Sequence, residues 1–283
     1  MLLSEILDSL NIPKDVEYSQ PLDSKLSWIH RRVGDTDIYF IANTTESPQD
    51  IDVRFRVSGK EAELWHPDTV AIKPAEYKIE NGLTIIPLHL DQRESVFVVF
   101  RRATSSPSRA IPNQTTTKLK TLAGPWNVSF PPNLGAPANI QLSELECWTE
   151  NTNQGVKYFS GTATYNKTVS APQSWFRPEV KIMLDLGIVK DIAQVSVNGK
   201  ALGTLWKQPY RVDVTGILKS GENKLEIKVT NEWTNRLIGD RSAPPDKKVL
   251  TAGHPMMLGF GRPQLLVESG LIGPVKLVSV ETH

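Results

Sequence analysis

Two short segments combine aromatic rings with amide or guanidinium groups. They supply Trp206, Tyr210 and Arg211 beside one turn, and Trp233, Asn235 and Arg236 in a second loop. An aromatic ring can stack on the apolar face of a pyranose, while amide and guanidinium groups donate hydrogen bonds to its hydroxyls. These six residues are the candidate carbohydrate-binding residues. A structural interpretation stays open, in which the two tryptophans lie at the edge of a core and Arg236 pairs with Asp240.

A basic cluster of His30, Arg31 and Arg32 is the second candidate site. It comes just before a predicted strand. Two interpretations stand: the cluster makes contacts between domains, which we favour, or it lies at the rim of a substrate cleft.

Acid/base catalysis of glycosidic bond cleavage requires two carboxyl groups facing each other across a cleft. The chain has 31 acidic residues, but the sequence singles out no pair. Four acids are expected near strand ends, where solvated turns and caps are the favoured interpretation: Asp185, Asp191, Asp213 and Asp240. The five histidines show no metal-ligand spacing, and Cys147 has no basic neighbour that would activate its thiol. We therefore assign no catalytic residue and no cofactor, and leave structural calcium and any metal site open.

The composition limits the classes of partner. Lys and Arg number 32 against 31 acidic residues, so the overall charge gives no sign of a nucleic-acid ligand. No apolar run reaches the roughly 20 residues that span a membrane. The first residues alternate apolar and acidic side chains without a basic leader, so we expect no signal peptide in this chain.

The elements that must position these residues are short strands. In Asp52–Val57, apolar and charged side chains alternate, as in a strand with one buried face. Asn81-Gly82 and Asn198-Gly199 are typical of tight hairpin turns. Leu225, Ile227 and Val229 are expected in the core, and Lys224, Glu226 and Lys228 on the surface. We therefore predict an all-β protein of two β-sandwich domains, with a short N-terminal helix.

Four segments follow from these patterns. They are a helical segment at 1–24, a small β-sandwich at 25–102, a linker rich in Ser, Thr and Pro at 103–119, and a larger β-sandwich at 120–283.

The stretch Val195–Asp240 resembles the galactose-binding-like jelly roll of family 2 glycoside hydrolases. Leu122–Phe130, Tyr158–Val169 and Ser269–Leu277, together with Trp28–Asn43 and Ala62–Thr69, resemble the C-terminal region of family 106 α-L-rhamnosidases. The resemblance covers nearly the whole chain. It implies that 1–24 is the end of a catalytic (β/α)8 barrel, that 120–283 is a galactose-binding-like jelly roll, and that the catalytic carboxylates lie in a barrel for which this chain has no room.

Three functions agree with these observations. The first is a carbohydrate-associated accessory region of a glycoside hydrolase, not catalytic by itself. The second is a hydrolase fragment or subunit that is active with a barrel supplied elsewhere, and the third is a surface adhesion or scaffold protein. The resemblance implies plant-type or other rhamnose-containing glycans and a catalytic barrel domain as partners. It also implies a periplasmic or secreted bacterial protein, whereas the residues themselves leave localisation unknown.

Overall fold

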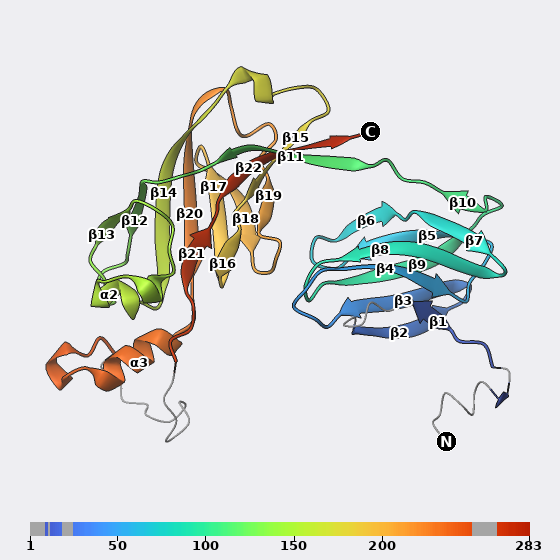
Figure 1. Cartoon of the computed structure of the whole chain (residues 1–283), viewed down its shortest axis with the longest axis horizontal. Helices are drawn as coiled ribbons and strands as arrows, with labels where there is room; N and C mark the ends of the chain where they lie inside the picture. Colours follow the sequence, from blue (N-terminus) through green and yellow to red (C-terminus); the bar gives the residue numbers. More distant parts are fainter. Residues whose placement is uncertain (1–8, 11, 19–24, 251–264) are drawn as a thin grey trace. The chain divides into compact units, whose positions relative to one another are not determined.

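The computed structural model describes residues 9–10, 12–18, 25–250 and 265–283. The chain divides into two units, Met1–Pro112 and Asn113–His283 (Figure 1). Most of the helix predicted within 1–24 lies outside the described residues. Among the described helices, none has the length and apolar character needed to cross a membrane.

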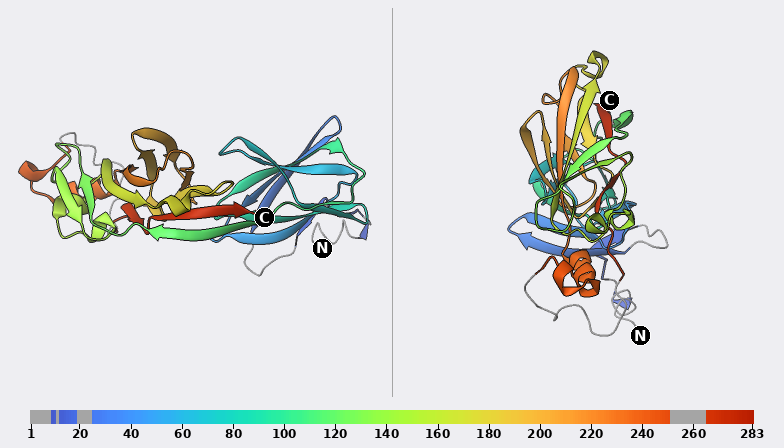
Figure 2. Two further views of the ribbon diagram at one scale, coloured as in Figure 1. Left: turned by 90° about the horizontal axis from the view of Figure 1, so that it is seen from above. Right: turned by 90° about the vertical axis from the view of Figure 1, so that its left-hand side faces the viewer.

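The first unit consists of two five-stranded antiparallel sheets. One has the order β1 (Val16–Tyr18), β4 (Gln49–Phe55), β8 (Leu83–Leu90), β7 (Tyr77–Glu80) and β10 (Ser108–Arg109). The other has the order β2 (Leu26–Val33), β3 (Thr36–Asn43), β9 (Ser95–Ala103), β5 (Lys60–His66) and β6 (Ala71–Pro74). Both sheets contribute apolar side chains to a single core, so they pack face to face as a sandwich (Figure 2).

Alternation in the sequence explains this sandwich. Along β4, buried and exposed residues alternate without exception, as predicted, because successive side chains of a strand point to opposite faces. Three rings from three strands meet in the core: Tyr39, Phe55 and Phe100 pack edge to face. Asn81-Gly82 joins β7 to β8 with positive φ angles of 51° and 80°, which is the backbone of a tight hairpin turn.

The second unit carries a six-stranded and a four-stranded sheet. The larger has the order β13 (Asn139–Leu142), β12 (Trp126–Ser129), β14 (Thr162–Ala171), β20 (Gly221–Thr230), β17 (Ile192–Val197) and β18 (Lys200–Leu205). The smaller has the order β11 (Gln114–Thr121), β22 (Lys276–Thr282), β15 (Lys181–Asp185) and β19 (Arg211–Asp213). A short pair, β16 (Ile188–Lys190) and β21 (Gly270–Gly273), completes the strands. The fold is therefore all-β, as predicted.

In the described part of the second unit, five short helical segments connect the strands. They are η1 (Trp148–Glu150), α2 (Gln154–Lys157), η2 (Gln173–Trp175), α3 (Thr234–Ser242) and η3 (Pro245–Lys247). The core between the sheets includes the predicted face of β20: Leu225, Ile227 and Val229 are buried. Of their neighbours, Lys224 and Lys228 are exposed and Glu226 is half-buried. The position of β20 between β14 and β17 explains why its inner face is completely covered.

The segment predicted as a linker contains strands. Within 103–119, β10 pairs with β7 of the first unit, and most of β11 pairs with β22 of the second. The division between the units, after Pro112, falls inside the segment. Its polar composition reflects exposure, because β11 is an edge strand with nearly all of its side chains in solvent.

Candidate functional site

The best-defined polar site of the second unit lies where β20 ends and α3 begins. Asn231 follows the strand and fixes this end of it: its Oδ1 accepts a hydrogen bond from the Gly161 amide at 2.9 Å, and its Nδ2 donates to the Phe159 carbonyl at 2.9 Å. The neighbouring hydroxyls of Thr230 and Thr162 lie 2.7 Å apart. Residues after Thr230 are therefore held firmly against the start of β14.

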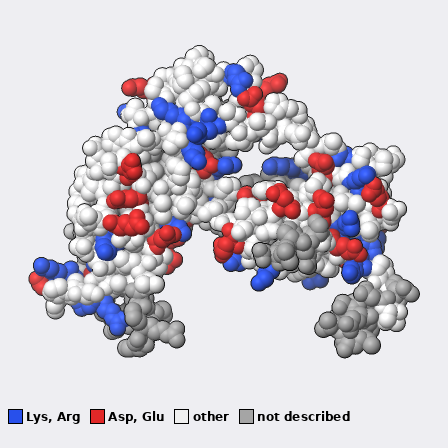
Figure 3. All heavy atoms as spheres, in the orientation of Figure 1, with Lys and Arg blue, Asp and Glu red and all other residues white. Residues whose placement is uncertain are grey.

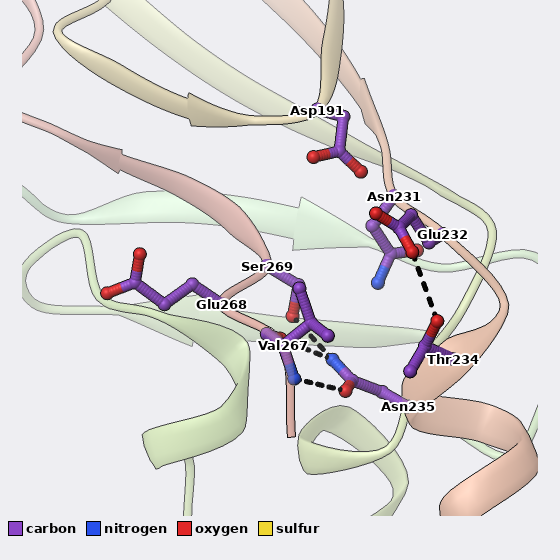
Figure 4. Close-up of a pocket in the computed structure, with 8 residues that line it drawn as sticks. All are labelled: Asp191, Asn231, Glu232, Thr234, Asn235, Val267, Glu268 and Ser269. Carbon is purple, nitrogen blue, oxygen red and sulfur yellow. Dashed lines mark hydrogen bonds between the residues drawn. The ribbon is translucent and has the colours of Figure 1, made fainter. Parts of the chain in front are cut away.

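Asn235, in the first turn of α3, binds the chain segment that precedes β21. Its Nδ2 donates to the Val267 carbonyl at 2.7 Å and to Ser269 Oγ at 3.3 Å. Its Oδ1 accepts from the Val267 amide at 2.8 Å (Figure 4). The Asn235 side-chain amide thus hydrogen-bonds to both the amide and the carbonyl of Val267, as the backbone of a neighbouring strand would. Only 2% of the residue is exposed, so Asn235 has its polar atoms committed within the protein.

Asp191 forms the opposite wall and stands at the start of β17. Its amide donates to the Thr230 carbonyl at 3.0 Å, and its carbonyl accepts from the Tyr210 hydroxyl at 2.7 Å. Its carboxylate is directed toward Asn231 and Glu232 (Figure 4). Burial, and then the negative charge of Glu232, raise the pKa of the Asp191 carboxyl above its ordinary value. Asp191 is therefore an acid that keeps its proton to a higher pH than an exposed aspartate.

The space enclosed by these groups is small. Asp191, Asn231, Glu232, Asn235 and Ser269 are among the residues that line a shallow hollow with essentially no free volume, about 0 Å³. Small-molecule sites typically measure about 300–1,000 Å³, so this one can meet the edge of a ligand but cannot enclose a sugar ring. In the described part of the chain, no three His, Cys, Asp or Glu side chains are grouped so as to hold a metal ion.

The two predicted tryptophans are solvent-facing. Trp206 is 61% exposed and Trp233 is 50% exposed. Ile192 is paired with Thr230, and Ala193 with Leu205, so both tryptophans follow strand ends at one end of the six-stranded sheet. Rings in such positions are free to stack on a ligand. Their binding of sugar stays a prediction.

Tyr210 and Arg211 both have partners within the second unit. Tyr210 is 6% exposed, and its hydroxyl is bonded to the backbone of Asp191. Burial, with the negative charge of Asp191 as the second cause, raises the pKa of this phenol. Arg211 pairs with Asp185 at 2.8 Å across β15 and β19. Of the strand-end acids, Asp213 accepts from the Thr215 amide in a turn, as expected.

Arg236 lies in a helix and is almost completely buried. The sequence predicts a loop here, whereas residues 234–242 form α3. Arg236 Nη2 lies 2.9 Å from Asp240 Oδ1, one helical turn later. This is the Arg236–Asp240 ion pair that the sequence suggests if Arg236 has a structural role. Asp240 also accepts from the amides of Val249 and Leu250, so this acid is a buried anchor and not a solvated cap.

His30 is engaged within the first unit. Its Nδ1 lies 2.8 Å from Asp15 and its Nε2 3.2 Å from Asp37, and its ring stacks on Tyr39 with centroids 4.0 Å apart. Lys60 pairs with Asp37 at 2.8 Å, and the pKa of Asp37 is lowered because its bonds to Lys60 and His30 outweigh burial. Arg32 is exposed and donates to the Gly34 carbonyl at 3.2 Å, and Arg31 is exposed on the same strand.

Sequence reasoning did not single out Asp191, Glu232 or Asn231 as a group. Asp191 was expected to be a solvated turn residue. The signal that could have found it is its place directly before the buried alternation of Ile192–Val197, since an acid at the start of a central strand is partly buried. Glu232 and Asn231 follow a second central strand, and the pairing of Ile192 with Thr230 brings the two strand ends together.

Comparison with known proteins agrees with this architecture. Residues 1–79 match the model of the α-L-rhamnosidase family, glycoside hydrolase family 106. Residues 144–258 match the galactose-binding domain-like model of family 2 glycosyl hydrolases.

Among the proteins similar to the chain are a solved rhamnosidase and a curated bacterial protein. A rhamnosidase structure from Novosphingobium sp. PP1Y is 40% identical with a TM-score of 0.85, covering 98% of this chain and 26% of that one. A protein of Formosa agariphila, provisionally named a β-glucuronidase, is 43% identical over 176 residues, 55% of this chain and 15% of its own length. The chain thus spans about a quarter or less of each relative. It is related to the glycoside hydrolases, with α-L-rhamnosidase-family sequence in its first unit and a galactose-binding-like domain in its second.

Proposed function

We propose that this chain is a carbohydrate-associated accessory region of an α-L-rhamnosidase-like glycoside hydrolase and does not hydrolyse glycosides by itself. One observation carries the proposal: nearly the whole chain corresponds to only 26% of a rhamnosidase. A (β/α)8 barrel needs about 250 residues of alternating strands and helices, whereas the described strands pair antiparallel in two sandwich-like units. The catalytic barrel is the expected partner in an intact homologue.

The acidic hollow at the end of β20 supports the same conclusion. Hydrolysis requires an acid and a second carboxylate on opposite sides of the bond, with the sugar between them. Asp191 and Glu232 come from adjoining strand ends and line a shallow hollow whose free volume is about 0 Å³. That volume is too small to seat a pyranose between the two groups.

Sugar binding in this proposal is carried by Trp206 and Trp233. Both rings are at least half exposed at the same end of the six-stranded sheet. One stacking ring and a few hydrogen bonds give millimolar affinity, which corresponds to about 4 kcal/mol. Rhamnose-containing glycans are the expected class of ligand.

The experiment is a glycan array probed with the whole purified chain, followed by titration of any glycan that binds. Trp206→Ala and Trp233→Ala should each weaken the interaction at least about fivefold, since each removes a stacking surface. Both positions are exposed, so the variants should unfold at the same temperature as the parent. Binding that is unchanged in the double variant would overturn the assignment of these rings.

A second candidate is suggested by the raised pKa of Asp191. An acid that holds its proton is suited to general acid catalysis once other groups complete its surroundings. In this alternative the chain is a hydrolase subunit or fragment that is active only with a barrel supplied elsewhere. Asp191→Asn would then abolish the activity of the assembled enzyme, whereas an accessory region would leave the rate constant of the chemical step unchanged.

A further inference from the structure

A larger hollow beside α3 is lined by a different set of residues from the site at the end of β20. Its volume is about 350 Å³, within the range of about 300–1,000 Å³ for small-molecule sites. Residues on α2, α3 and η3 line it, so distant parts of the sequence meet there. It belongs to the second unit alone.

Arg236 supplies a cation with unused hydrogen-bonding capacity. The residue is 5% exposed, and its Nε has no hydrogen-bond partner although it is buried. A buried donor without a partner is costly, and native proteins keep few of them. Asp240 pairs with Nη2 but also receives the amides of Val249 and Leu250. The Asp240 carboxylate therefore accepts from three groups, and it cannot satisfy all five N–H donors of the Arg236 guanidinium.

Two glycines bring backbone close to this guanidinium, and a third packs against one of them. A Cβ on Gly239 would lie 2.6 Å from Arg236 Nη2, and one on Gly135 would lie 2.9 Å from Nη1. A Cβ on Gly155 would lie 2.1 Å from the Gly135 carbonyl oxygen. All three residues line the hollow. Larger residues would collide with the arginine or its support, so the packing here depends on glycine at each position.

The remaining walls carry a second cation, an aromatic ring and two uncharged polar groups. Lys247 adds a second, exposed ammonium, and lysine and arginine side chains gather over the α3 and η3 segment (Figure 3). Tyr158 presents a half-buried ring, and Ser242 and Gln154 present a hydroxyl and an amide. We propose that this hollow binds a carboxylate-bearing sugar residue, a hexuronate. The carboxylate faces Arg236 and Lys247, and the ring lies against Tyr158.

Each part of the proposal follows from one property of the site. Guanidinium and ammonium groups bind carboxylates by charge-assisted hydrogen bonds. The aromatic ring selects a ligand with an apolar face, and the hydroxyl and amide select one with hydroxyl groups. The inference rests on the proposed association with glycans in one respect only: that association is the reason for expecting a sugar acid and not another carboxylate ligand. The hollow is distinct from the tryptophans, so Trp206→Ala should leave hexuronate binding unchanged.

The test is titration of the whole chain with methyl α-D-galacturonoside, with the neutral methyl α-D-galactoside and acetate as matched ligands. We expect millimolar binding of the uronoside, and at least about tenfold weaker binding of each comparison ligand. Lys247→Gln should weaken the uronoside about fivefold, whereas Lys248→Gln, an exposed neighbour that does not line the hollow, should change it less than twofold.

Ser242→Trp serves as a blocking variant, because Ser242 is exposed and a large ring there would occupy the hollow. Its thermal unfolding should match the parent while uronoside binding is lost. Equal affinity for the neutral sugar, equal effects of the two lysine variants, or no detectable uronoside binding at 20 mM (about twenty times the expected dissociation constant) would each overturn the proposal. Uronoside binding lost in Trp206→Ala but kept in Ser242→Trp would assign the sugar to the tryptophans instead.

Discussion

Removing the hydroxyl of Tyr165 should destabilise the second unit strongly. Tyr165 is fully buried on β14, and its oxygen accepts from Trp148 Nε1 at 2.6 Å and from the Leu271 amide at 3.1 Å. Tyr165→Phe keeps the ring but leaves two buried donors without an acceptor. Each unsatisfied donor costs about 1–3 kcal/mol, so we expect the free energy of unfolding to fall by about 2–6 kcal/mol.

The same hydroxyl also holds the segment that faces α3. Leu271 follows Ser269, whose amide donates to Cys147 Sγ at 3.3 Å, and Asn235 binds the same segment. Urea unfolding of the whole chain, followed by circular dichroism, measures the loss, and amide hydrogen exchange at Leu271 should become faster. Lys228→Ala, on an exposed face of the same sheet, is the control and should change stability by less than about 0.5 kcal/mol. A Tyr165→Phe loss below about 1 kcal/mol would refute the reasoning.

Three further predictions concern the second unit. Ile227→Ala removes a fully buried side chain from the central strand and should cost about 2–5 kcal/mol in the same unfolding assay; under 1 kcal/mol would mean that the site collapses around the loss. Because the folded state raises the pKa of Asp191, it binds that proton more tightly than the unfolded chain, and ionisation costs stability as pH rises from about 4 through the raised pKa. The change in the free energy of unfolding caused by Asp191→Asn should therefore be more favourable at pH 7 than at pH 4. The opposite order would contradict the raised pKa of Asp191. Trp206→Phe should retain part of the glycan affinity that Trp206→Ala loses, measured by titration, since a smaller ring still stacks; equal loss in both would point away from stacking.

The strands were predictable because their side chains repeat with a period of two. Asp52–Phe55 and Leu225–Val229 lie in strands with one covered face, so buried and exposed positions alternate in the sequence as apolar and polar residues. The sequence of strand β11 shows no such alternation of apolar and polar residues. It is held by backbone hydrogen bonds to β22 at the edge of a sheet, and its exposed side chains are free to be Thr, Gln and Lys.

The helix α3 was missed for a related physical reason. Its buried residues are Asn235, Arg236, Gly239 and Asp240, which are polar or lack a side chain. They are buried by hydrogen bonds and an ion pair, not by apolar contact, so no apolar period of 3.6 residues appears.

Residue types did not reveal which of the candidate side chains would be exposed and which buried. Trp206 and Trp233 are available to solvent, whereas Asn235 and Arg236 are buried. Asn235 is bonded to backbone, and Arg236 pairs with Asp240 while its Nε has no partner. The meeting of Asp191 with Glu232 depends on the pairing of β17 with β20. The register of two strands far apart in the sequence is not contained in either segment alone.

The most direct test of the account is a turnover assay on the pure, whole chain. An aryl α-L-rhamnoside is supplied at millimolar concentration, and release of the aryl group is followed over the pH range 4–8. We expect no release above the rate in buffer, because the hollow between Asp191 and Glu232 cannot hold a sugar between two carboxyl groups. Steady turnover by the parent chain that disappears in Asp191→Asn or Glu232→Gln would contradict it.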